Sequence, residues 1–171
     1  ETADRTVLQE LLTTSRDHEP EVRAKIARAL ARVEGPESLN ALLQLARDPV
    51  WFVRVRAFDA LGQKSTLSAG PSVMAGLEDP KPEVRYRAAY ALRRIHGMQG
   101  SVIAKVLAEG SPRSFRSLIS EWDRAGFLGD LVAGLSTRDW SRFMECRSRL
   151  KTLIAAGVIR PLVDFVLVFP D

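Results

Sequence analysis

The sequence has almost no cysteine and lacks the motifs that usually mark an active site. Cys146 is the single cysteine, so no disulfide can form within the chain. This favours a reducing compartment such as the cytoplasm and leaves a disulfide-free periplasmic domain open. The sequence has no phosphate-binding loop, no metal-ligand spacing and no nucleophile motif. We therefore expect neither catalysis nor a cofactor.

Long apolar runs and a strong charge bias are also missing. No run approaches the roughly 20 residues that span a bilayer, and no signal peptide is visible. The net charge of +4 leaves open only weak binding of nucleic acid or of an anionic surface. With 46% hydrophobic and 27% charged residues, the 171-residue chain has the composition of a folded domain. Because it begins with Glu1 rather than Met, we expect a fragment of a larger protein, whose remainder could carry a membrane anchor.

What the sequence does contain is a repeat. "EVRAKIARAL" begins at residue 21, "FVRVRAFDAL" at residue 52 and "EVRYRAAYAL" at residue 83, so the copies are 31 residues apart. Apolar residues recur in each copy at helical spacing, which predicts an amphipathic helix, here named helix A. A second apolar segment, helix B, comes before each copy, as in "SLNALLQLARD". Each unit is therefore predicted to be a helical hairpin that buries its apolar faces against neighbouring hairpins.

Aspartate and arginine recur in the same register. In the first three copies an Asp lies six residues before the Arg, whereas Gly110 and Ser141 take its place in the last two. We interpret the set as structural: each Arg pairs with the Asp of its own or the adjacent repeat and binds loop carbonyls. A row of anion-binding groups is the alternative. We also expect each Asp to accept N–H groups at the start of helix A. This Arg–Asp ladder consists of Asp17, Arg23, Asp48, Arg54, Asp79, Arg85, Arg116 and Arg147.

The repeat pattern is similar to that of a known family. "DHEPEVRAKIARAL" at 17–30 and "DPKPEVRYRAAYAL" at 79–92 resemble the short HEAT-like repeat, a type also seen in phycobilisome lyases. The resemblance implies an all-α fold, a right-handed α-solenoid of about five 31-residue hairpins with helix A on the convex side. The expected repeats form one domain, 1–171, and run over about 17–47, 48–78, 79–109, 110–140 and 141–171, after a half-repeat at 1–16.

The family resemblance says less about function, because such repeats act as scaffolds in unrelated systems. We expect a non-enzymatic protein–protein interaction module of a larger, bacterial protein. Two alternatives stay open. One is a nucleic-acid-binding or DNA-repair protein of HEAT-like fold, for which Trp122 and Asp123 are candidate residues. The other is a ligand-binding protein similar to a chromophore lyase.

Trp51 and Phe52 depart from the repeat, because the other copies have Pro20-Glu21 and Pro82-Glu83 at these positions. Two aromatic residues at a loop edge suggest a contact with another protein, rimmed by arginines. The alternative is that they fold back over helix B. The predicted partner-binding residues are Trp51, Phe52, Arg54, Arg56 and Arg87.

The remaining aromatic and basic residues have simpler expected roles. Lys25, Arg56 and Arg87 form a basic row on the A helices, which is either a solvated outer face or a surface for nucleic acid or anionic lipid. Trp122 and Trp140 are expected to fill packing gaps in the degenerate repeats. Cys146 takes a valine position and is expected to be a buried small apolar residue.

Overall fold

The structure, a computed structural model, describes residues 2–95 and 110–155. These residues form helices joined by short turns, and no strand occurs among them. The chain forms two compact units, Glu1–Met98 and Gln99–Asp171, which are described separately here. The predicted single domain therefore stays a prediction. The apolar "FVLVF" segment near the end of the sequence lies outside the described residues.

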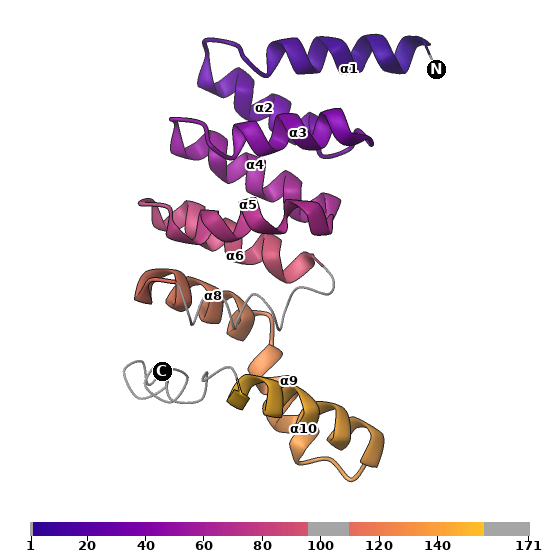
Figure 1. Ribbon diagram of the computed structural model, residues 1–171, viewed down its shortest axis with the longest axis vertical. Helices are drawn as coiled ribbons and strands as arrows, with labels where there is room; N and C mark the ends of the chain where they lie inside the picture. Colours follow the sequence, from indigo (N-terminus) through magenta and orange to yellow (C-terminus); the bar gives the residue numbers. More distant parts are fainter. Residues whose placement is uncertain (1, 96–109, 156–171) are drawn as a thin grey trace. The chain divides into compact units, whose positions relative to one another are not determined.

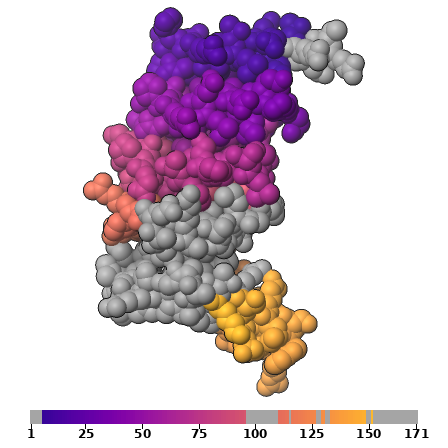
Figure 2. All heavy atoms as spheres, viewed as in Figure 1, coloured from indigo at the N-terminus to yellow at the C-terminus, as the bar shows by residue number. Residues whose placement is uncertain are grey.

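The first unit is a stack of antiparallel helices that follow one another in chain order (Figure 1). The A helices alternate with B segments. The A helices are α2 (Pro20–Leu30), α4 (Trp51–Lys64) and α6 (Pro82–Arg94), and the B segments are α1 (Thr2–Thr14), α3 (Pro36–Leu45) and a broken third segment. That third segment consists of η1 (Leu67–Ala69), α5 (Gly70–Ala75) and η2 (Gly76–Glu78). On the side shown in Figure 2, successive layers of this unit follow each other without a visible gap.

Local sequence explains where the A helices begin. Pro20 and Pro82 occupy the first helical positions of α2 and α6, where the missing N–H has no intrahelical acceptor to lose. The Asp before each helix accepts from the backbone N–H two residues on, as Asp48 Oδ1 does from Val50 at 2.9 Å. The capping residues of α2, α4 and α6 themselves make no side-chain cap hydrogen bond. The expected Asp caps are therefore turns that precede the helices, because each Asp lies two residues before the capping position and accepts from the N–H of the capping residue itself.

Small residues allow the helices of the first unit to pack closely. A Cβ built on Gly62 of α4 would lie 2.9 Å from Ala91 Cα of α6, so only glycine fits there. Gly76 likewise lies against Phe58 and Ala88. Around these contacts the core consists of fully buried aliphatic side chains, among them Leu30, Leu42, Leu61, Val84 and Leu92.

The second unit contains α8 (Pro112–Arg124), α9 (Phe127–Leu135) and α10 (Trp140–Ala155) among its described residues. Ser111 caps α8 by accepting from Ser114 N–H at 3.2 Å. Gly126, with φ 77°, makes the turn between α8 and α9. Leu118, Ile119 and Trp122 are buried, and so is Cys146, as expected. None of the helices that the structure describes is both long and apolar enough to cross a bilayer.

Candidate functional site

Arg23 joins two successive repeats. Its Nε and Nη2 donate to the Asp48 carboxylate at 2.7 and 2.9 Å. Its Nη1 donates to the carbonyls of Asp17 and His18 at 2.9 and 3.0 Å. One guanidinium thus holds the loop before its own helix and the carboxylate of the following repeat. Of the two pairings considered from the sequence, the carboxylate contact is with the adjacent repeat, and the contact within the repeat is with backbone oxygens.

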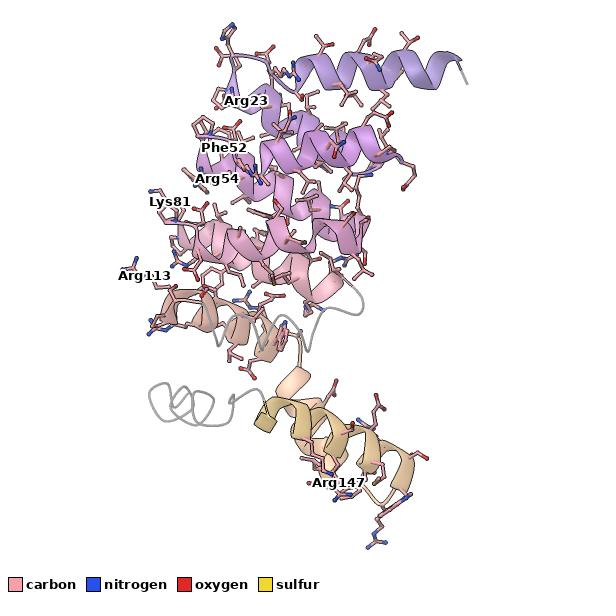
Figure 3. All side chains as sticks on the ribbon, viewed as in Figure 1. Arg23, Phe52, Arg54, Lys81, Arg113 and Arg147 are labelled. Atoms are coloured by element: carbon pink, nitrogen blue, oxygen red, sulfur yellow. The ribbon has the colours of Figure 1, made fainter. Side chains whose placement is uncertain are left out.

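Arg54 repeats the arrangement one hairpin further along. It donates to the Asp79 carboxylate at 2.7 and 2.8 Å and to the carbonyls of Asp48 and Pro49 at 2.8 and 3.1 Å. Its side chain is only 13% exposed and that of Asp79 only 9%. In Figure 3, Arg23 and Arg54 lie at the same end of their helices, one above the other. The ladder is therefore a series of bidentate pairs between repeats.

The ladder does not continue in the same form at Arg85. Its Nη1 donates to the carbonyls of Asp79 and Pro80 at 2.8 and 3.1 Å, the same distances as for Arg54. Its Nε is buried, however, and has no hydrogen-bond partner. The sequence explains the difference, because Gly110 stands at the register position where the next Asp would be.

The predicted ladder residues of the second unit differ again. Arg116 and Arg147 are both exposed. Arg147 forms no ion pair with a described residue, and its nearest polar contact places Nη1 3.9 Å from Met144 Sδ. The ladder prediction for Arg147 stays a prediction, because the segment that follows α10 in the repeat order lies outside the described residues. Ser141 stands 25 residues after Arg116, at the position that the partner Asp holds in the earlier copies, and Asp139 instead accepts from Ser141 N–H.

The pairing of Arg23 with Asp48 shifts both pKa values. The hydrogen bond to Asp48 raises the pKa of the Arg23 guanidinium against the opposing effect of burial. Burial alone would raise the pKa of Asp48, but the hydrogen bonds from Arg23 and Val50 and the charges of Arg23 and Arg54 lower it overall. Asp48 is therefore ionised at neutral pH, and its pairing stabilises the fold there.

The surface of the A helices contains a hollow of about 470 Å³ between α2 and α4, named here the α2–α4 groove. Helix α2 contributes residues at i, i+3, i+4 and i+7, which share one helix face, and α4 contributes two residues one turn apart. The lining residues are Glu21, Ala24, Lys25, Arg28, Phe52 and Arg56.

Phe52 is the large apolar side chain in the α2–α4 groove. It is half-buried and contacts the 40% exposed Trp51 edge to face, with 6.0 Å between ring centroids. The other two copies place Glu21 and Glu83 at this register position. The two aromatics therefore do form part of an open surface, and neither is fully buried by helix B.

Positive charge surrounds Phe52. Lys25, Arg28 and Arg56 are exposed, against the single carboxylate of Glu21. Lys25 and Arg28 form no ion pair with any residue that the structure describes. Arg56 lies 3.7 Å from Asp59, a loose contact. The groove thus combines an apolar floor with three exposed cations, of which Arg56 alone has a carboxylate contact, a long one, among the described residues.

Two of the predicted partner-binding residues lie elsewhere. Arg54 does not rim the α2–α4 groove, because its guanidinium is held by Asp79 and the loop carbonyls. Arg87 pairs with Asp59 across the repeat at 3.2 Å and does not line the groove. Burial raises the pKa of Asp59, although the charges of Arg87 and Arg56 oppose this shift. Sequence reasoning placed Lys25 only in a basic row on the A helices and did not connect it with Arg28, although the i, i+3 spacing of these two residues places them on one face of α2.

A second hollow, of about 450 Å³, lies at the loop ends of α1 and α3. The paired Arg23 and Asp48 form part of its wall, together with the exposed Arg16 and Arg47. Arg23 and Asp48 neutralise each other in this wall, because they form the ladder pair that joins two repeats. We therefore interpret the hollow as part of the connection between repeats and not as a binding site. No group of three His, Cys, Asp or Glu side chains among the described residues is placed to hold a metal ion.

The two tryptophans of the second unit have different environments. Trp122 is 3% exposed and packs in the interior, as expected for a residue that fills a gap. Trp140 is 71% exposed, so the corresponding expectation for it is wrong. As the first residue of α10, it lies at the end of the helix rather than on the face that packs on α9.

Stacked helical hairpins tied by Arg–Asp pairs between repeats define a helical repeat protein. A family model described as HEAT repeats matches residues 1–62 and 39–119, which together make up more than half of the chain. The chain belongs to the HEAT-repeat family. No curated protein matches the sequence. HEAT repeats generally mediate protein–protein interactions.

Proposed function

We propose that this chain is a non-enzymatic protein-interaction module and that its α2–α4 groove binds an acidic segment of another protein. The observation that carries the proposal is Phe52, a half-buried aromatic residue surrounded by three cationic side chains. Repeat stacking does not require an aromatic residue there, since α2 and α6 pack with glutamate at the same position. An exposed aromatic side chain in a charged surface is a common anchor of protein interfaces.

The groove also indicates the chemistry of the bound segment. An apolar side chain would pack on Phe52 and Ala24, while neighbouring carboxylates would meet Lys25, Arg28 and Arg56. Glu21 repels carboxylates, so we expect the acidic residues of the segment to lie toward Lys25, Arg28 and Arg56 and away from the end of the groove near the loop. Because these charges are exposed, we expect them to contribute mainly to association rate and partner choice, and the apolar anchor to contribute most of the affinity.

The finer features of the architecture belong to the same proposal. We propose one domain of about five 31-residue hairpins in a right-handed superhelix, within a larger bacterial protein of the cytoplasm. The repeat register through residue 147 supports the hairpin count. Weak, salt-sensitive binding of nucleic acid or of an anionic surface by the basic A-helix face is a minor activity under this proposal.

Peptide binding tests the groove directly. The probe is a short fluorescein-labelled peptide with Asp and Glu on both sides of a central Phe, and binding is followed by fluorescence anisotropy. The double variant Trp51→Pro, Phe52→Glu restores the sequence of the other copies and should fold normally. We expect it to weaken binding by about tenfold or more, as for loss of an aromatic anchor. Lys25→Glu combined with Arg28→Glu should weaken binding and reverse its salt dependence, because the groove then carries a net negative charge that salt screens from the acidic peptide.

The matched control is Tyr86→Ala on α6, which removes an aromatic side chain of similar exposure, 38% against 40% for Trp51, outside the groove. We expect it to leave peptide affinity unchanged. A peptide with Lys in place of Asp and Glu should bind at least tenfold more weakly than the acidic probe. Equal affinity for both peptides, or equal losses in the groove and control variants, would contradict the proposal.

A further inference from the structure

Trp140 is the most exposed large apolar side chain that the structure describes, at 71%. Its position is fixed by the start of α10, where Asp139 Oδ1 accepts from the N–H groups of Ser141 and Arg142 at 2.9 and 3.2 Å. The indole therefore extends outward from an ordered helix end and not from a loose loop.

The indole is also supported from one side. Phe143 lies one turn along α10, and the two rings are stacked with centroids 5.6 Å apart and planes 25° apart. Phe143 covers one face of the indole, and the exposure of Trp140 leaves the other face to solvent. The pair is an aromatic platform with one open flat face, which we name the Trp140 platform.

The surroundings of the Trp140 platform are basic. Between residues 138 and 151 the sequence has five basic and two acidic side chains. One acid, Asp139, is held by the helix start, and the other is Glu145. None of the exposed basic residues forms an ion pair within the described part of the chain, in contrast to Arg23 and Arg54. These exposed residues are Arg138, Arg142, Arg147 and Lys151.

We propose that the Trp140 platform binds single-stranded nucleic acid. An unpaired base would stack on the open face of Trp140, and the backbone phosphates on either side would contact Arg138, Arg142 and Arg147. Stacking needs an exposed π face and phosphates need accessible cations. The platform has an exposed indole, and its exposed cations form no ion pair with any residue that the structure describes. A base within a duplex is already stacked on both faces, so the platform selects single strands. Base stacking is tolerant of sequence, and we expect little sequence preference.

An anionic membrane surface fits the same residues less well. Membrane-surface helices bury a long apolar face. Among the side chains of α10 that the structure describes, the exposed large apolar ones are Trp140 and Met144, both near its start. The other exposed side chains described further along are polar, as at Glu145, Arg147 and Ser148. An aromatic platform confined to one helix end matches the size of a base and is small for a bilayer.

The test uses the full chain and a fluorescein-labelled oligothymidylate followed by anisotropy, with circular dichroism to check folding. Trp140→Ala should weaken binding by about tenfold, and Trp140→Phe should retain most of the affinity, because a ring is enough for stacking. Arg142→Gln combined with Arg147→Gln should weaken binding and flatten the salt dependence. For two or three contacted phosphates, log K should fall with log salt with a slope of about −1.5 to −2 before this change.

The matched control is Trp51→Ala, which removes the other exposed tryptophan from the first unit and should not change oligothymidylate binding. It also keeps this proposal separate from the proposed function, whose variants all lie at the α2–α4 groove. Duplex DNA of equal length should bind at least tenfold more weakly than the single strand. The proposal is overturned if oligothymidylate does not bind at low salt, or if Trp140→Ala binds as tightly as the original chain. It is also overturned if vesicles of phosphatidylcholine and phosphatidylserine bind through Trp140 while oligothymidylate does not.

Discussion

Replacing Arg54 by alanine should lower the free energy of unfolding by about 2–4 kcal/mol. The change removes two hydrogen bonds to the Asp79 carboxylate, at 2.7 and 2.8 Å, and two to loop carbonyls. It also leaves Asp79, whose side chain is 9% exposed, with only the Lys81 N–H as a partner. Removing one member of a buried ion pair costs roughly 3–5 kcal/mol, and the remaining exposure of this pair reduces that figure somewhat.

Arg85 provides the matched control inside the same chain. It occupies the same register position and makes the same two carbonyl contacts, but it has no carboxylate partner. Arg85→Ala should therefore cost about 1 kcal/mol, the typical net value of a neutral-acceptor hydrogen bond in this setting. Helix propensity cancels in the comparison, because both substitutions lie in the first turns of A helices.

Urea unfolding followed by circular dichroism measures both variants. The comparison requires similar m-values, because repeat arrays can lose two-state behaviour when one interface weakens. A double-mutant cycle with Asp79→Asn should give a coupling energy of about 1.5–3 kcal/mol for the Arg54 pair. Equal losses for Arg54→Ala and Arg85→Ala would refute the reasoning, since the carboxylate contact would then contribute nothing.

Three further predictions concern single positions. Asp48→Asn should destabilise the chain by about 2 kcal/mol at pH 7. In urea titrations the difference should begin to shrink only below about pH 4, where the unfolded carboxyl takes up its proton, and it should vanish once the pH falls below the lowered pKa of folded Asp48. Asp59→Asn should behave oppositely, since burial raises the pKa of Asp59: the stability of the variant relative to the original chain should rise as pH increases from about 4 to 7. Gly62→Ala should lower the thermal midpoint and cost about 1–3 kcal/mol, because its Cβ would lie 2.9 Å from Ala91 Cα; an unchanged midpoint would show that α4 and α6 can separate freely.

Most of the helical pattern could be predicted from the 31-residue period, because each copy has the same apolar spacing. The partner of each ladder arginine could not. The repeat pattern left open the Asp of the same repeat, six residues before the Arg, and that of the next repeat, and the carboxylate contact is with the Asp 25 residues on. The distance between stacked hairpins decides this choice, and a pattern along one chain does not contain that distance. The third B segment, at residues 67–78, is broken into three short helices. Gly70, Pro71 and Gly76 are the local sequence signal for this break, since glycine and proline disfavour a continuous helix.

The candidate sites were predictable only where they depart from the repeat. Phe52 stood out because two intact copies showed what the position normally holds. The surroundings of Trp140 could not be judged in this way, since its repeat is too degenerate to supply a reference. Trp140 is the first residue of α10, and Asp139 accepts from the N–H of Ser141 at this helix start. In the first three copies the corresponding Asp stands at a register position that would be 141 in this copy, two residues later.

Arg54 and Phe52 lie two residues apart on α4, yet we propose opposite roles for them, and this contrast provides the sharpest test of the proposed function. Arg54 is held within the stack, so Arg54→Ala should lower the urea midpoint and leave peptide affinity unchanged when measured on folded protein. The other copies pack with glutamate at the position of Phe52, so the stack does not depend on its ring. Phe52→Glu should therefore change the free energy of unfolding by no more than about 0.5 kcal/mol and weaken peptide binding about tenfold. If Phe52→Glu unfolded the chain instead, the aromatic residue would belong to the core and the α2–α4 groove would lose its anchor. If Arg54→Ala abolished peptide binding without loss of stability, the ladder itself would be the binding surface.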